Sequence, residues 1–220
     1  MNSQRASNRI VQTTFLTFAC TIAAWIGAWI LKTRLDGSFA WFSAGLGSFL
    51  YWTAAKLLIW IAPALWLLER AGLSAREVLG LRNWRAGLAW GGGVGLLIAL
   101  TGIIPNYLQG RPILPAQLDF GLVNVLLIAP TFEEFLMRGA IQGSLQERWP
   151  IWTANMITSV LFVILHIPGW YFMGTLADNL TQPAGGALSI FLVSLAFGYA
   201  VRRSGSLLGG VAAHFLNNLF

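Results

Sequence analysis

The stretch IVQTTFLTFACTIAAWIGAWIL, residues 10–31, decides the fold class. Its 22 residues carry no charge, and a helix of this length, at about 1.5 Å rise per residue, reaches across the hydrocarbon core of a bilayer. Comparable apolar runs follow along the chain, and we predict spans at 10–31, 49–68, 86–104, 121–141, 152–171, 187–201 and 206–220. The sequence therefore predicts an all-α fold, a polytopic transmembrane helical bundle of about seven spans. It leaves open an eighth, missing span, and we expect a single integral-membrane domain over residues 1–220.

The overall composition agrees with a membrane protein. Hydrophobic residues make up 56% of the chain and charged residues 10%, whereas a soluble domain usually carries about 25% charged residues. A net charge of +6 would suggest nucleic acid in a soluble protein. Here the basic residues fall in the predicted loops, where topology and anionic headgroups explain them. We therefore expect membrane lipid as a partner and no nucleic acid.

The basic residues of the loops predict a cytoplasmic N-terminus. The first apolar run is too long for a signal peptide and lacks a clear cleavage site, so we expect a retained first helix. With the N-terminus inside, the cytoplasmic segments hold Arg5, Arg9, Arg70, Arg76, Arg82, Arg85, Arg148, Arg202 and Arg203. The outer loops then hold Lys32, Arg34 and Arg111. Nine against three favours this orientation by the positive-inside rule. Trp170, near a predicted outer end, would belong to an aromatic belt.

The segment PTFEEFLMRGA, residues 130–140, places three charged residues in the fourth predicted span. Ionisable groups inside a membrane are rare and usually face a bundle interior or an aqueous cavity. Residues four apart share one helix face, so Glu134 and Arg138 are expected to form an ion pair that offsets the cost of burying them. Glu133 points elsewhere, and an unpaired, partly desolvated carboxylate suits a general base. Pro130, which lacks a backbone N–H, is expected to disrupt the turn before it.

The two histidines of the chain also lie in apolar segments. His166 ends the stretch FVILH and shares a helix face with Phe162, while His214 begins HFLNN and shares a face with Asn218. Taken singly, each histidine would be expected to form an interhelical hydrogen bond. Asn218 would be a polar contact between helices, and Phe162 would pack in the core. It is their concentration in the last four spans that indicates a functional site.

Other unusual features have structural explanations. Lys56, inside the second span, is expected to face the bundle or to extend its charge to the interface. The glycines of GGGVG, residues 91–95, favour close helix packing rather than a phosphate loop, because the segment follows no strand and lacks the Lys-Ser/Thr ending. Gly139 and Gly143 are expected to permit close helix approach after the charged cluster.

Three motifs now stand in order on separate helices. EEFLMR fits Glu-Glu-x-x-x-Arg, FVILH fits Phe-x-x-x-His, and HFLNN fits His-x-x-x-Asn. In this the sequence resembles the CPBP family of intramembrane proteases, also called Abi, which includes the type II CAAX prenyl endopeptidases and bacteriocin-processing or immunity proteins. LGLR, residues 79–82, is also similar to the family. The motifs lie within residues 120–220, and the first two spans match only in kind.

The resemblance implies an intramembrane endopeptidase that hydrolyses a peptide bond of a membrane-associated protein or peptide, in CAAX-type or bacteriocin-type processing. It implies a bacterial or archaeal plasma membrane as the location. Glu133 and His166 would activate the attacking water, and His214 and Asn218 would stabilise the oxyanion. The supporting residues would be Glu134, Arg138 and Phe162.

The sequence leaves the metal and the alternative functions open. Two histidines and a glutamate can hold a catalytic zinc ion, so Glu133, His166 and His214 would be the ligands of a metal-dependent enzyme. His-Glu-x-x-His spacing is absent, and we favour water activation without a cofactor. The alternative function is a non-enzymatic immunity or scaffold protein of the same fold. A transporter is a third class, but the paired half-repeats with broken helices that transporters commonly show are not found. The sequence predicts no oligomeric state.

Overall fold

The computed structural model describes the backbone of residues 2–220 and the side chains from Asn8 onward. Arg5, one of the basic residues behind the predicted orientation, lies outside the described side chains. The described residues form helices and no strand, which confirms the predicted all-α class. In chain order the elements are α1 (Asn2–Ser38), α2 (Ala40–Ser43), α3 (Gly45–Lys56), η1 (Leu57–Ile61), α4 (Ala62–Arg70), α5 (Ala75–Leu79), η2 (Leu81–Asn83), α6 (Trp84–Leu108), α7 (Phe120–Val123), η3 (Asn124–Ile128), α8 (Ala129–Glu134), η4 (Phe135–Gln142), α9 (Gly143–Gln146), α10 (Ile151–Phe172), α11 (Leu176–Thr181), α12 (Ala187–Ser204) and α13 (Leu208–Leu219).

Six helical stretches in the described residues are long and apolar enough to cross a membrane: Asn8–Ser38, Gly45–Arg70, Ala75–Leu108, Phe120–Gln146, Ile151–Phe172 and Ala187–Ser204. They contain the first six predicted spans. The seventh predicted span is represented by α13, which has 12 residues. At the helical rise this is about 18 Å, short of a hydrocarbon core of about 30 Å.

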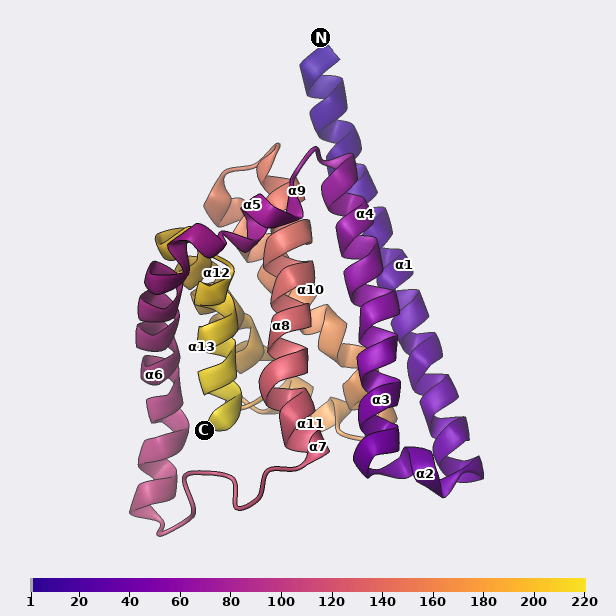
Figure 1. Ribbon diagram of the computed structural model, residues 1–220, viewed down its shortest axis with the longest axis vertical. Coiled ribbons are helices and arrows are strands. Elements are labelled where there is room, and N and C mark those ends of the chain that lie inside the picture. The colour runs from indigo at the N-terminus through magenta and orange to yellow at the C-terminus, as the bar shows by residue number, and fades with distance from the viewer. Residues whose placement is uncertain (1) are drawn as a thin grey trace.

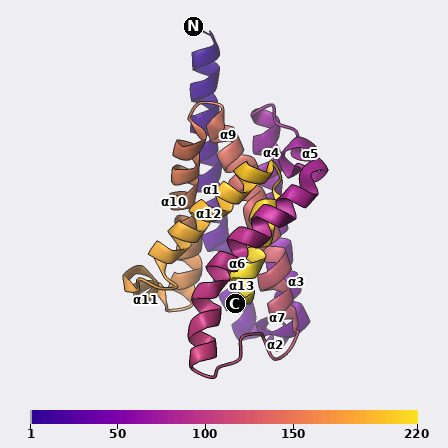
Figure 2. The ribbon, with the colours of Figure 1, turned by 90° about the vertical axis from the view of Figure 1, so that its left-hand side faces the viewer.

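The fourth span lies at the centre of the bundle. Figure 1 shows α8 in the middle, with α1 and the continuous helix α3–α4 on one side and α6 and α13 on the other. Every residue from Phe135 to Gln142 is buried. Figure 2, turned by 90°, shows α6 crossing in front of α13 and the beginning of α1 projecting beyond the other helices. The charged motif of the sequence therefore lies on a central span whose Phe135–Gln142 stretch is fully buried.

Glycines allow α6 to lie directly against α13. A Cβ atom added at Gly91 would come within 2.5 Å of the Gly209 carbonyl oxygen, and one at Gly95 within 2.9 Å of the Cα of Ala213. The packing interpretation of GGGVG is therefore confirmed for these two positions. Gly139 has a similar role, because a Cβ there would meet Val78 at 3.0 Å.

Two of the spans contain a wide π-helical turn just before a proline. The turn η1 precedes Pro63, and η3 precedes Pro130. The N–H of Ala129 bonds to the Asn124 carbonyl, five residues back, instead of four. Since proline has no N–H to continue the regular ladder, a local π turn is one way for the helix to keep its other hydrogen bonds. The predicted disruption before Glu133 is thus present.

Candidate active site

The predicted ion pair of the fourth span is present and fully enclosed. Arg138 Nη1 lies 3.0 Å from Glu134 Oε1, and neither side chain is exposed to solvent. The same carboxylate oxygen lies 3.0 Å from Nδ1 of His214 on α13. Glu134 therefore joins the first and third sequence motifs, which stand 80 residues apart.

Arg138 ties the central helix to α12 as well. Its Nη2 donates to the backbone carbonyl of Ser194 at 2.8 Å and to the hydroxyl of Ser194 at 2.6 Å. The guanidinium carbon lies 4.7 Å from the ring centre of Phe162 and 5.6 Å from that of Phe197. Phe162 is 2% exposed. The guanidinium lies over the face of its ring, where a cation is attracted to the π electrons.

A glycine leaves room for the Glu134 carboxylate. A Cβ atom added at Gly210 of α13 would lie 2.7 Å from Glu134 Oε2 and 2.8 Å from a methyl carbon of Val201. The Oε2 oxygen is buried and has no hydrogen-bond partner among the described residues. The carboxylate thus lies against the backbone of α13, and this close approach brings it within reach of His214.

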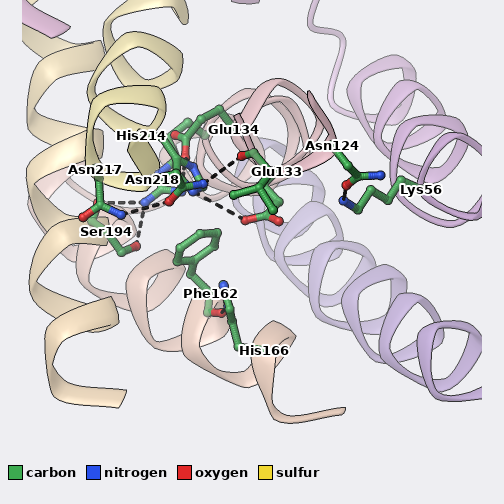
Figure 3. A network of polar contacts seen from close by, with 12 residues as sticks. Lys56, Asn124, Glu133, Glu134, Phe162, His166, Ser194, His214, Asn217 and Asn218 are labelled. Atoms are coloured by element: carbon green, nitrogen blue, oxygen red, sulfur yellow. Dashed lines mark hydrogen bonds and ion pairs between the residues drawn. The ribbon is translucent and has the colours of Figure 1, made fainter. Parts of the chain in front are cut away.

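The hydrogen bond to Glu134 fixes how His214 faces Glu133. A carboxylate in an ion pair accepts hydrogen bonds, so Nδ1 of His214 carries the proton and donates. The ring stacks on Phe197, with ring centres 4.8 Å apart and 18° between the planes. Its other nitrogen, Nε2, then lies 3.9 Å from Glu133 Oε2. Figure 3 shows His214 between the two glutamates, connected to each by a dashed line.

His166 has its ring orientation fixed by its own helix. Its Nδ1 lies 2.8 Å from the Phe162 carbonyl oxygen, which can only accept, so Nδ1 carries the proton and Nε2 of the neutral ring is an acceptor. The ring centre is 4.8 Å from that of Phe162. No hydrogen bond joins His166 to Glu133 in the described part of the chain, but both side chains line one cavity.

Asn218 lies at the far end of the cluster, next to η3. Its Nδ2 donates to the Val125 carbonyl at 3.0 Å, and its Oδ1 accepts from Asn217 at 3.0 Å. One proton of the Asn218 amide remains without a partner among the described residues. The structure thus brings Glu133, Glu134, Arg138, Phe162 and His214 into contact, and His166 joins this cluster through Phe162 (Figure 3).

A cavity of about 250 Å³ opens beside Glu133 and His166. Its lining residues are Trp25, Trp29, Trp52, Lys56, Trp60, Asn124, Glu133, Leu165, His166, Gly169, Trp170 and Met173. Lys56 is 7% exposed and donates to Asn124 Oδ1 at 2.6 Å. Of the two roles considered for Lys56, facing the bundle is therefore the one found. Trp170, predicted for an aromatic belt, is instead buried in the cavity wall.

Sequence reasoning did not place Lys56, Asn124 or Ser194 at the site. The one signal for Lys56 was that an isolated cation in an apolar span needs an interior partner. Ser194 and Asn124 carry no such signal, because uncharged polar residues are common between membrane helices.

The donor atoms do not form a ready metal site. Among residues 2–220 no group of three or more His, Cys, Asp or Glu side chains is arranged to hold a metal ion. Glu133 and His214 approach each other, while His166 stands apart from both in Figure 3. Metal ligation by Glu133, His166 and His214 therefore stays a prediction.

Comparison with known proteins finds a family similar to the part of the chain that contains the three motifs. Residues 115–220 match the family described as Type II CAAX prenyl endopeptidase Rce1-like. An Escherichia coli protein described as "Uncharacterized 24.3 kDa protein" is 26% identical over 211 residues, covering 88% of this chain and 88% of that protein. No solved structure matches the chain. The matched region contains all three motifs, so the resemblance inferred from them is confirmed: residues 115–220 are similar to the Rce1-like type II CAAX prenyl endopeptidases.

Proposed function

We propose that this protein is an intramembrane endopeptidase that hydrolyses a peptide bond of a membrane-associated peptide or protein by direct activation of water. The family match supports a CAAX-type protease. The finer proposal, a glutamate-type mechanism, rests on one observation: Glu134 binds both Arg138 and His214 through one oxygen, and His214 thereby presents Nε2 at 3.9 Å from Glu133.

In the proposed reaction Glu133 is the general base. A water molecule between Glu133 and the acceptor Nε2 of His166 attacks the carbonyl carbon of the scissile bond, and its proton passes to Glu133. The carbonyl π bond becomes the oxyanion of a tetrahedral intermediate. When the intermediate collapses, the C–N bond breaks, and the leaving amine takes the proton from Glu133. Atoms and charge balance without any further reactant.

The oxyanion is stabilised by donors from the third motif. An imidazole between two carboxylates donates to both only when both its nitrogens are protonated, and in that form Nε2–H of His214 can turn from Glu133 to the oxyanion. The free amide proton of Asn218 is the second candidate donor. Glu134 and Arg138 are positioning residues in this scheme, since they act through His214.

The test is mass-spectrometric profiling of peptide termini in membranes that contain the wild type or Glu133→Gln, each with and without a chelator. Cleavages present only with the wild type and insensitive to the chelator are the expected result. Loss of those cleavages with the chelator would replace the metal-free mechanism by a metal-dependent one. Identical profiles from two folded, equally abundant proteins would favour the immunity or scaffold alternative.

A further inference from the structure

The cavity beside Glu133 has two walls of different origin. Glu133 and His166 belong to the family-matched part of the chain, whereas five lining residues, Trp25, Trp29, Trp52, Lys56 and Trp60, come from the two N-terminal spans outside it. Figure 3 shows Lys56 and Asn124 facing each other, on the other side of Glu133 from His214. The proposed reaction uses neither of these two residues.

Lys56 is a buried cation with spare hydrogen-bonding capacity. An ammonium group has three donors. One goes to Asn124 Oδ1 at 2.6 Å, and the ammonium also lies 5.5 Å from the ring centre of Trp60. No other hydrogen bond of Lys56 is present in the part of the chain that the structure describes. A cation held in this way, 7% exposed, is costly unless an anion accompanies it.

Apart from the Glu133 carboxylate in the same cavity, several polar groups around Lys56 are donors as well. An ammonium can only donate, so the oxygen of Asn124 must face it and the amide Nδ2 must face away. That Nδ2 is buried without a partner among the described residues, and so are the indole Nε1 atoms of Trp29 and Trp60, whose side chains line the same cavity. A positive charge with several unused N–H groups is complementary to an oxyanion, since charge-assisted hydrogen bonds are the strongest available to such groups.

We propose that Lys56 and Asn124 form a binding site for a free carboxylate of the substrate peptide, which fixes the cleaved bond a short distance from the peptide's C-terminus. This inference rests on the proposed peptidase function. A terminal carboxylate and the scissile carbonyl belong to one extended chain, so a single peptide can reach Lys56 and Glu133, which line one cavity of about 250 Å³. A phosphate of a lipid headgroup has the same charge but brings no peptide carbonyl to Glu133.

The second reading of Lys56 is that it serves only as a counter-charge to Glu133 in the same cavity. The two roles differ in what they predict about the ligand. A counter-charge affects every substrate alike, whereas a carboxylate site distinguishes a peptide acid from its amide. Binding therefore separates the roles without any need for cleavage.

The experiment measures binding of N-acetyl-Leu-Leu-Leu, as free acid and as C-terminal amide, to the full chain carrying Glu133→Gln in phosphatidylcholine nanodiscs. Tryptophan fluorescence is a suitable readout because the cavity wall is rich in tryptophan. We expect the acid to bind about 10-fold or more tightly than the amide, as a charge-assisted contact requires. Adding Lys56→Met should abolish the preference, and Lys56→Arg should retain part of it. The matched control is Lys32→Met. This lysine is 5% exposed, pairs with Asp36 and lies 5.9 Å from the ring centre of Trp52, but it does not itself line the cavity, so its loss should leave the preference intact.

Equal binding of acid and amide, or a preference that survives Lys56→Met in a protein of unchanged helicity and size, would overturn the proposal. Nanodiscs with phosphatidylglycerol form a second arm. If this lipid displaces the acid in a Lys56-dependent way while the acid shows no advantage over the amide, the anion is a headgroup and the peptide site is wrong. Cleavage without acid preference would refute this inference alone, and acid preference without any cleavage would refute the proposed function alone.

Discussion

At the scale of single residues, Glu134 connects the first sequence motif to the third, and its partner Arg138 connects them to Phe162 of the second. One oxygen of its carboxylate accepts from Arg138 and from His214, both at 3.0 Å. Arg138 in turn donates a hydrogen bond to Ser194, and the ring of Phe162 lies under the guanidinium of Arg138. Removing any one of these partners leaves a charge or a donor buried among apolar side chains, where it costs more than the lost contact.

Arg138→Met should therefore destabilise the fold more than the double substitution Glu134→Gln with Arg138→Met. The single variant leaves the Glu134 charge uncompensated inside the protein, at a cost of about 3–5 kcal/mol, and the double variant removes both charges. Thermal unfolding of the purified proteins in one detergent provides the comparison. If the double variant melts at a lower temperature than the single variant, the uncompensated charge of Glu134 is not what destabilises Arg138→Met.

His166→Gln should lower cleavage by about 100-fold, at the lower end of what a general base contributes, because the acceptor Nε2 that helps to hold the water for Glu133 is lost, while the melting temperature changes little. In the described part of the chain, the hydrogen bond of the ring to the Phe162 carbonyl and its ring contacts with Phe162 and Trp170 all lie within its own helix. Cleavage of a substrate found by terminus profiling, measured together with thermal unfolding, separates the two effects. Unchanged activity would exclude His166 from the proposed water activation.

At the scale of the helices, close backbone contacts decide where the motif residues meet. Spacing of four residues was enough to predict the Glu134–Arg138 pair and the shared faces of the two histidine motifs. It could not predict the Lys56–Asn124 contact, whose partners are 68 residues apart, because nothing in local periodicity encodes which helices pack together. Nor did it reveal the π-helical segments η1, η3 and η4: Pro63 and Pro130 mark η1 and η3, but no proline lies just after η4.

Gly210→Ala should impair the site through this packing. The added methyl group would lie 2.7 Å from Glu134 Oε2 and 2.8 Å from Val201, so the carboxylate or α13 must shift, and overpacking of this kind costs about 1–3 kcal/mol. We expect a lower melting temperature and reduced cleavage. Gly92→Ala is the control, because it lies in α6 with no atom within 4 Å of the added Cβ. Equal effects of the two substitutions would contradict the packing explanation.

At the scale of the whole molecule, the distribution of hydrophobicity predicted the architecture well. Long apolar runs correspond to six of the predicted spans, and the all-helical class follows from them. The cavity could not be predicted from the sequence. Trp170, for example, lies near the end of a predicted span and so resembles an aromatic-belt residue, but in the structure it lines the cavity wall. We infer that the matched C-terminal half carries out the hydrolysis and that the N-terminal spans contribute to substrate selectivity.

The orientation predicted from loop charges can be tested with a membrane-impermeant maleimide. Cys20 is exposed on α1, so the test starts from Cys20→Ser. A cysteine at Gln109, in the loop after α6, should react in intact cells, because this loop is predicted to lie outside. One at Arg203, at the end of α12, should react only after the membrane is opened. The reverse pattern would place the N-terminus on the outer side.

The measurement that most directly tests water activation by Glu133 is isotope incorporation at new peptide ends. Membranes with the wild type or Glu133→Gln are incubated in ¹⁸O-labelled water, and C-termini are read by mass spectrometry before any digestion. Hydrolysis by an activated water predicts C-termini that carry ¹⁸O with the wild type and are missing with Glu133→Gln. The same labelled termini from both proteins, each folded and equally abundant, would contradict it.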